Sequence, residues 1–167
     1  MFIQFLRTNK WASGILLVLR LYLGYSWFTA GFKKAFGGEF DATGFLNGAI
    51  AKATGENPTV KSWWGWFLEH VALPYADLFT FLVAWGEVLV GVGLILGGLT
   101  KTAAFFGVLM NMAFLLSGTV STNPILLILS IFILVAGSNA GRWGLDHYVF
   151  SKINVMRSRS NETRSST

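Results

Sequence analysis

The amino-acid sequence predicts an all-α membrane protein: a four-helix transmembrane bundle with an extracytoplasmic, tryptophan-rich helical cap between its first and second helices. Hydrophobic residues make up 53% of the 167 residues and charged residues only 13%, about half the charged fraction of a typical soluble domain. Four apolar runs are separated by polar breaks, and three of the seven tryptophans fall within residues 63–66. At this length one domain is expected; we place it at residues 1–156, followed by a disordered cytoplasmic tail at 157–167.

The first predicted span covers residues 11–32 and is followed by Lys33 and Lys34. At 1.5 Å per residue it covers roughly 30 Å, the thickness of the hydrocarbon core of a bilayer. Arg7 and Lys10 precede it, as basic residues precede the apolar core of a signal peptide. The run is longer than the roughly 7–15 residues of such a core and lacks a clear small-x-small cleavage site. We therefore interpret it as a retained transmembrane helix.

Three further apolar runs predict the remaining spans, at residues 77–96, 102–118 and 124–139. Asn123 followed by Pro124 is a favourable helix start, because an asparagine side chain caps the helix and proline suits its first turn. The connections at 97–101 and 119–123 are short. We therefore expect the helices that they join to be antiparallel neighbours.

The long connection at residues 37–75 is predicted to form the cap. Behind Asp41, apolar residues recur on one face of a short helix that we expect to stop at Gly55. These residues are Phe45, Leu46, Ala49, Ile50 and Ala53. Thr59 opens a second apolar stretch, residues 60–71, which carries the tryptophan cluster. Because tryptophan prefers the headgroup layer, we expect this segment to lie at the membrane interface, over the mouth of the bundle.

The basic residues predict which side of the membrane each end faces. Arg7, Lys10 and Lys101 lie near span ends on one side, together with five basic residues between positions 142 and 164. On the other side, four lysines are diluted by four acidic residues in the long cap. The positive-inside rule then places both termini in the cytoplasm, as in a multi-pass protein of a bacterial or archaeal plasma membrane. The net charge of +5 lies beside the apolar runs, which favours anionic lipids at the cytoplasmic face as partners, and not nucleic acid.

Three polar side chains are predicted near the middle of the spans: Arg20, Glu87 and Asn111. An unpaired charge at the bilayer centre costs at least about 2.5 kcal/mol. Counting residues from each membrane entry puts Arg20 and Glu87 at similar depth, so we predict a buried ion pair between them. Asn111 reaches the same level, where an interhelical hydrogen bond would also account for it. The pair is either part of a functional site or a device that fixes helix register, and the sequence leaves both open.

Small and aromatic residues share the helix faces of these polar side chains. Gly24 and Trp27 lie on the face of Arg20, and Gly91 lies on the face of Glu87. Small residues let transmembrane helices approach closely, and they also leave space for a flat ligand. The sequence alone does not separate these two uses.

The composition excludes several kinds of redox centre. The chain has no cysteine, so it has no disulfide, thiol redox chemistry, iron–sulfur ligation or covalently attached haem. His70 and His147 are predicted on opposite sides of the membrane, which disfavours a bis-histidine haem, and no group of histidines and carboxylates has the spacing of metal ligands. We therefore predict no haem, metal or flavin.

Two pairs of residues outside the spans are secondary site candidates. Glu69 and His70 are neighbours beneath the tryptophan cluster of the cap. Arg142 and Asp146 follow the last span and are four residues apart, so they either form an ion pair on a helical turn or anchor the chain at the membrane interface together with Trp143.

Three groups of spaced residues resemble the motifs of the DoxX/DoxD family. The groups are Arg20, Gly24, Phe28, Gly31 and Lys33 in the first span; Glu87, Gly91, Leu94, Gly97, Thr100 and Lys101 around the second; and Gly141 to Asp146 after the fourth. The resemblance covers roughly residues 12–150 and implies a four-helix membrane domain. In the namesake members this domain is the membrane subunit of a thiosulfate:quinone oxidoreductase, in other words of a thiosulfate dehydrogenase that uses quinone.

The resemblance implies a site for a diffusible quinone, either ubiquinone or menaquinone. As catalytic residues, Arg20 would stabilise an anionic oxygen and Glu87 would accept or relay a proton. The expected quinone-binding residues are Trp27, Gly24, Gly91, Asn111 and Lys33. The expected partners are a second redox subunit and further copies of this chain.

Two other functions stay open at the level of the sequence. A non-catalytic membrane scaffold that assembles with a redox enzyme fits the lack of cofactor ligands. A small-solute transporter fits less well, because transporters of this kind usually contain repeated, broken helices, and the spans show no clear internal repeat.

Overall fold

The computed structural model describes residues 1–38, 40–54 and 57–148, and within these ranges every regular element is helical. The elements are α1 (Phe2–Thr8), α2 (Lys10–Phe36), α3 (Ala42–Ala51), α4 (Ser62–Phe67), a π-helical turn (Leu68–Ala72), a 3₁₀ turn (Leu73–Tyr75), α5 (Ala76–Leu96), α6 (Thr100–Leu116), α7 (Asn123–Ala136) and a final 3₁₀ turn (Gly137–Gly141). The all-helical prediction is confirmed. The predicted tail at 157–167 and the predicted helix stop at Gly55 lie outside the described residues.

Three helical stretches are long and apolar enough to cross a membrane: α2, the continuous helix Ser62–Leu96, and the helix Asn123–Gly141. α6 is also apolar but has 17 residues, or roughly 25 Å of helix. α2 has 27 residues and is longer than predicted. Lys33 and Lys34 lie in its last turn and do not end it.

Side-chain caps account for the start of two helices. The side chain of Asn9 begins α2 by accepting a hydrogen bond from the backbone N–H of Trp11 at 2.7 Å. Asp41 begins α3, as predicted, because its carboxylate accepts the N–H of Thr43 at 2.9 Å. This bond stabilises the charged form of Asp41 and so lowers its pKa below the ordinary value.

The start of α7 differs in detail from the prediction. Asn123 is the first residue of the helix and Thr122 occupies the capping position. The side-chain amide of Asn123 instead donates to the carbonyl of Thr119 at 2.9 Å. Pro124 still lies in the first turn, where its missing N–H breaks no helical bond.

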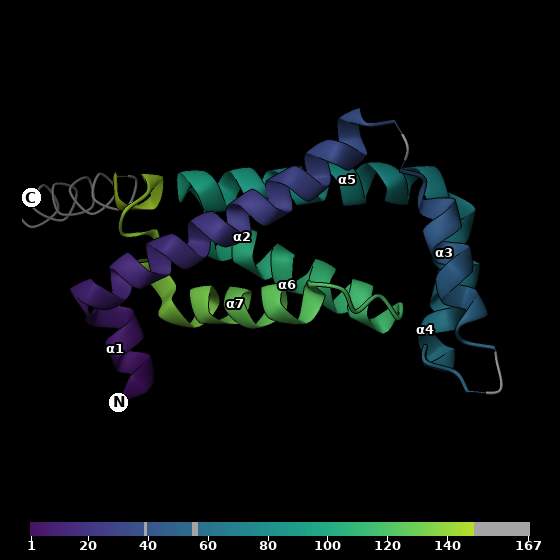
Figure 1. Ribbon diagram of the computed structural model, residues 1–167, viewed down its shortest axis with the longest axis horizontal. Coiled ribbons are helices and arrows are strands. Elements are labelled where there is room, and N and C mark those ends of the chain that lie inside the picture. The colour runs from purple at the N-terminus through teal and green to yellow at the C-terminus, as the bar shows by residue number, and fades with distance from the viewer. Residues whose placement is uncertain (39, 55–56, 149–167) are drawn as a thin grey trace, which may run out of the picture.

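α2 and α5 are the most closely packed pair of helices, and they run antiparallel (Figure 1). A Cβ atom added at Gly31 would lie 2.5 Å from the backbone nitrogen of Val88, and one added at Gly91 would collide with the backbone of Phe28. Glycine is therefore required at both positions, because any side chain would push the two helices apart.

The remaining elements lie at the two ends of the bundle. Figure 1 shows α3 and α4 crossing one end, while α1 and the turn Gly137–Gly141 lie at the other. α3 and the π-helical turn share a small core of their own, which includes Leu46 and Leu68. The indole N–H of Trp64 donates to the hydroxyl of Ser117 at 2.9 Å and ties α4 to the end of α6. α4 begins at Ser62, later than the predicted start at Thr59.

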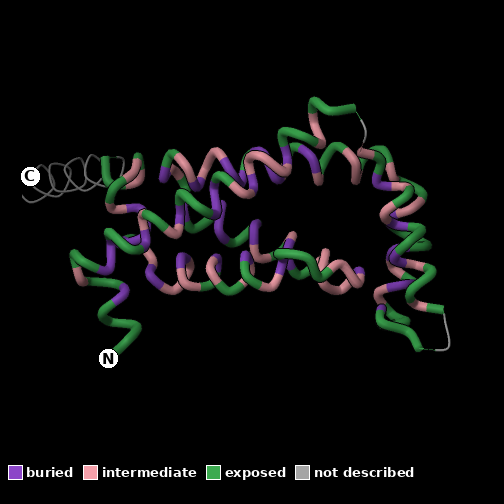
Figure 2. Tube along the Cα trace, viewed as in Figure 1, coloured by how far each residue is buried: buried purple, intermediate pink, exposed green. Residues whose placement is uncertain are grey.

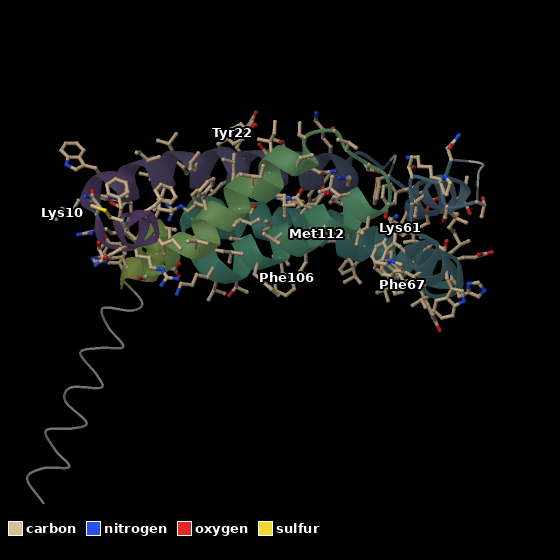
Figure 3. The ribbon with its side chains drawn as sticks, turned by 90° about the horizontal axis from the view of Figure 1, so that it is seen from below. Lys10, Tyr22, Lys61, Phe67, Phe106 and Met112 are labelled. Atoms are coloured by element: carbon tan, nitrogen blue, oxygen red, sulfur yellow. The ribbon has the colours of Figure 1, made fainter. Side chains whose placement is uncertain are left out.

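Buried residues gather on the inward faces of the helices and exposed residues on the outward faces (Figure 2). The outward faces of the bundle are apolar: Tyr22, Phe106 and Met112, labelled in Figure 3, are each at least 44% exposed. A soluble protein rarely exposes so many large apolar side chains. The surface of the bundle therefore fits a surrounding of lipid.

Candidate functional site

Arg20 lies buried near the end of the bundle that carries α1. Its side chain is 1% exposed. Nη1 donates to the carbonyl of Ala140 and Nη2 to the carbonyl of Trp143, each at 3.2 Å. Ala140 lies in the final turn that follows α7, where carbonyls have no helical N–H partner. The guanidinium therefore satisfies the end of one helix and joins it to α2.

Asp146 completes this junction from the C-terminal side. One carboxylate oxygen accepts the N–H of Leu99 at 2.7 Å and the other accepts the N–H of Thr100 at 2.9 Å. These groups open α6, where a negative charge is favoured by the helix dipole. Arg142 and Asp146 form no ion pair in the described structure, so the first of their two possible roles is not seen; the carboxylate of Asp146 is engaged by backbone amides at the start of α6.

Glycines fill the rest of the junction. Gly97 has a left-handed backbone, with φ of +63°, and a Cβ atom there would collide with the guanidinium of Arg20 and lie 2.8 Å from the Cα of Gly144. A Cβ atom at Gly141 would lie 2.7 Å from a carboxylate oxygen of Asp146. The junction has no room for even a methyl group at these positions, although Nε of Arg20 has no hydrogen-bond partner within the described residues.

Glu87 lies towards the other end of the bundle and pairs with Lys34. The ammonium of Lys34 donates to both carboxylate oxygens of Glu87, at 2.7 and 2.6 Å. The side chain of Glu87 is 2% exposed and that of Lys34 is 26% exposed. The predicted ion pair between Arg20 and Glu87 is therefore wrong, since each charge has different partners.

The register of α2 against α5 explains this error. Gly31 lies beside Glu87, whereas Arg20 lies beside Gly97, ten residues further along α5, or roughly 15 Å of helix. Counting from the predicted span ends assumed that the two helices begin and end level with each other. α5 instead ends beside Arg20, which lies ten residues after the start of α2 at Lys10.

Lys34 is a candidate site residue that the sequence reasoning did not name as one. Its spacing in the sequence nevertheless indicates that it faces the interior of the bundle. Trp27, Gly31 and Lys34 follow the spacing i, i+4, i+7 and so share one helix face. Lys33, which was the predicted site residue, is exposed. A basic residue at the end of an apolar run is usually a stop signal, and that interpretation hid the role of its neighbour.

A cavity of about 390 Å³ lies beside the Lys34–Glu87 pair, between the bundle and the cap. Its walls come from α2, α3, α4, α5, α6 and α7. These walls are mostly aromatic and aliphatic. The aromatic lining residues include Trp27, Phe40, Phe45, Trp64, Phe67 and Phe114. The ammonium of Lys34 lies 5.4 Å from the ring centre of Phe40 and 5.9 Å from that of Phe114. The ion pair is thus the charged patch of a mainly apolar chamber.

Several buried polar atoms near this cavity have no partner within the described protein. They are Nε1 of Trp27 and both amide atoms of Asn111. Trp27 lines the cavity, and its Nε1 lies 3.4 Å from the position that a Cβ of Gly107 would take. Asn111 is one helical turn from Gly107 and therefore on the same face of α6. A buried polar atom without a hydrogen bond lowers the stability of the folded protein by about 1–3 kcal/mol. These atoms are therefore unused hydrogen-bonding groups beside the cavity.

The other predicted site residues lie elsewhere. Gly24 and Gly91 pack α2 against α5 and face helix atoms. His70 stacks on Trp66 in the cap, and its Nδ1 lies 4.0 Å from the carboxylate of Glu69; both side chains are more than half exposed. In the described part of the chain, no cluster of three or more histidines and carboxylates can hold a metal ion.

The long apolar helices, the lipid-like surface and the inward-facing charges define a polytopic helical membrane protein with an internal cavity. The DoxX family profile matches residues 15–119, which include most of α2 and all of α3, α4, α5 and α6. The chain belongs to the DoxX family. Searches of curated proteins and of solved structures found no match.

Proposed function

We propose that this protein is a quinone-linked oxidoreductase subunit of the DoxX type, similar to the membrane subunit of a thiosulfate:quinone oxidoreductase. The observation that carries the proposal is the apolar cavity with the Lys34–Glu87 pair on its wall. A volume of about 390 Å³ lies within the usual range of small-molecule sites, which are mainly apolar with a few well-placed polar groups. A quinone headgroup has this same combination of a flat apolar ring and polar oxygens.

The residues of the cavity fit such a ligand at both its ring and its oxygens. Aromatic side chains line the chamber and can stack on a ring. The ammonium of Lys34 has three N–H donors and gives two bonds to Glu87, which leaves one donor for a ligand oxygen. Nε1 of Trp27 and the amide of Asn111 supply unused hydrogen-bonding groups.

In this proposal Lys34 holds a ligand oxygen and Glu87 moves the proton. A bound quinone would supply an acceptor for the two electrons that are released when two thiosulfate anions join through a new sulfur–sulfur bond, and the two protons of the resulting quinol would come from water. Glu87 is a buried carboxylate hydrogen-bonded to the partly exposed Lys34, so it would accept a proton that enters from water past Lys34 and relay it to a ligand oxygen. The second proton would follow the same route. Arg20 is assigned to the structural junction and not to this chemistry.

The proposed membrane arrangement follows the charge distribution. α2, α5, α6 and α7 form four spans, with α3 and α4 as an extracytoplasmic cap and both termini in the cytoplasm of a plasma membrane. The proposed partners are a second redox subunit and further copies of this chain.

The test measures binding of decyl-ubiquinone and of a menaquinone analogue to the purified protein in nanodiscs. We expect saturable binding that Lys34→Gln weakens about tenfold or more, since a charged hydrogen bond is worth about 1.5–3 kcal/mol. Lys33→Gln is the matched control, because it removes the same charge from an exposed neighbour. If neither quinone binds, and no thiosulfate-dependent reduction occurs with candidate partner subunits, the proposal is wrong.

A further inference from the structure

Two adjoining hollows lie at the end of the bundle opposite to the cavity. The first, of about 570 Å³, is lined by Lys10, Trp11, Gly14, Leu17 and Trp143. The second, of about 410 Å³, is lined by Arg142, Trp143, Gly144, His147 and Tyr148. Trp143 belongs to both, so we treat the two hollows as one feature and call it the basic groove.

The wall between the two hollows is held in a fixed position. The indole N–H of Trp143 donates to the hydroxyl of Ser13 at 3.0 Å, and this hydroxyl donates to the carbonyl of Lys10 at 2.6 Å. The ring of Trp143 therefore stands against the first turn of α2, with Lys10 on one side and Arg142 next to it in sequence. The groove is a built feature that joins the N-terminal and C-terminal parts of the chain.

The charge of the basic groove has one sign. Lys10 and Arg142 line it, and within the described residues no carboxylate does. Among the neighbouring charges, Arg7 donates to the carbonyl of Val135 at 2.9 Å, and the carboxylate of Asp146 is engaged by the start of α6. Arginine and lysine together suit a phosphate, because guanidinium binds it through two parallel hydrogen bonds and ammonium adds a point charge.

The floor of the basic groove is apolar and continues along a membrane-crossing helix. Gly14 and Leu17 lie on α2, and a Cβ atom added at Gly14 would have nothing within 4 Å. Trp11 is 84% exposed and Trp143 is 63% exposed, as expected of tryptophans at the level of lipid headgroups. α1 adds the exposed side chains of Phe2 and Phe5 at the same end. A ligand here meets cations at one end and apolar surface at the other.

We propose that the basic groove binds one phospholipid with an anionic headgroup. Arg142 and Lys10 hold the phosphate, the two tryptophans flank the glycerol region, and the first part of an acyl chain lies over Gly14 and along Leu17. The proposal is independent of the quinone site, which lies at the other end of α2.

The test measures lipid binding to the purified protein by native mass spectrometry, with phosphatidylglycerol and phosphatidylcholine offered in equal amounts. We expect phosphatidylglycerol to be retained preferentially, and the double variant Lys10→Gln/Arg142→Gln to lower its affinity at least tenfold. The control variant Lys33→Gln/Lys61→Gln removes two charges from the opposite end of the molecule; Figure 3 shows Lys10 and Lys61 far apart along the long axis. An equal loss of affinity in the control would overturn the proposal.

A second variant separates a shaped site from general surface charge. Gly14→Leu keeps every charge and meets open space at its Cβ, and leucine also favours a helix more than glycine does. We therefore expect a stably folded variant that binds phosphatidylglycerol at least tenfold more weakly. Unchanged binding by this variant would contradict the proposal. So would competition by inorganic phosphate alone, because the site would then recognise a free anion.

Discussion

Arg20 lies in a junction without free space, whereas Glu87 forms part of a cavity wall. Both residues are 1% exposed, and both lie on long apolar helices. Arg20 is bound by backbone carbonyls and enclosed by glycines. Glu87 is bound by a single flexible side chain that reaches the edge of the protein. The two regions are therefore a closed end and an open end of one bundle.

This difference shows what a buried charge in a membrane helix can and cannot indicate. Such a charge is treated as a functional candidate by default. At the closed end it satisfies the orphan carbonyls that follow α7, and no ligand can replace these partners without breaking the fold. At the open end a ligand can reach the ion pair from the cavity. The space around a charge, rather than the charge itself, separates the two roles.

The largest expected effect is a loss of protein stability when Gly97, in the junction around Arg20, is changed to alanine. The added Cβ would meet Arg20 and the backbone of Gly144, in a left-handed conformation that disfavours alanine. We expect a loss of about 4 kcal/mol of stability from overpacking and backbone strain together, measured as thermal or denaturant unfolding in detergent. Gly48→Ala is the matched control, because its Cβ meets open space, and it is expected to raise stability slightly. Similar stabilities of the two variants would show that the junction is looser than described.

The next effect concerns the open end, where Lys34→Met leaves Glu87 buried without a partner. We expect a loss of about 3 kcal/mol, at the lower end for a broken buried pair because Lys34 is partly exposed. The double variant Lys34→Met/Glu87→Leu should recover most of this stability, since it removes both charges. Neither variant should bind decyl-ubiquinone in nanodiscs. If the double variant binds it as the unmodified protein does, the ion pair is a structural device like the one at the closed end.

The sequence predicts the helices well because helix length and apolarity are local properties. The runs that become α2, α5 and α7 were identified from composition, and the start of α3 from Asp41, whose cap is confirmed. The predicted end of α2 is too early, because a pair of lysines after an apolar run predicts a stop and the helix continues to Phe36. A lysine side chain can extend from within a helix toward water while its backbone stays helical, so a basic pair does not define a helix end.

The candidate site was less predictable because it depends on the register between helices. Glu87 and Asn111 were identified correctly as buried polar residues, but the partner of Glu87 was not. A shift of ten residues along α5 separates Arg20 from Glu87, and no local pattern specifies it. The register is set by glycines such as Gly31 and Gly91, whose contacts depend on both helices at once. The cavity depends further on the cap, whose position over α6 involves the bond between Trp64 and Ser117.

A smaller effect on stability is expected from substitution of two buried asparagines, Asn111 near the cavity and Asn139 at the closed end. The amide of Asn139 donates to the carbonyls of Leu6 and Asn9, at 2.8 and 3.0 Å, whereas Asn111 has no hydrogen-bond partner among the residues that the structure describes. Asn139→Leu should therefore cost about 1–2 kcal/mol, while Asn111→Leu should gain about 1 kcal/mol by removing unpaired polar atoms. Both changes are measured by unfolding without added ligand. Asn111→Leu should also weaken decyl-ubiquinone binding several-fold, and unchanged binding would place this residue outside the site.

The smallest effect concerns the cap over the open end and its dependence on pH. The N–H of Thr43 lowers the pKa of Asp41 in the folded protein, so this carboxylate stabilises α3 at any pH above its unfolded pKa, near 3.9. Its contribution is lost as the pH falls through the lowered folded pKa, because the protonated acid is a weaker acceptor. Hydrogen exchange at the amides of α3, compared with the variant Asp41→Asn, isolates this contribution. The variant caps the helix without titrating, so its corrected exchange rates should stay level while those of the unmodified protein rise in acid. The amides at the start of α2, capped by the neutral Asn9, are the internal reference, and an equal rise there would assign the change to general acid unfolding.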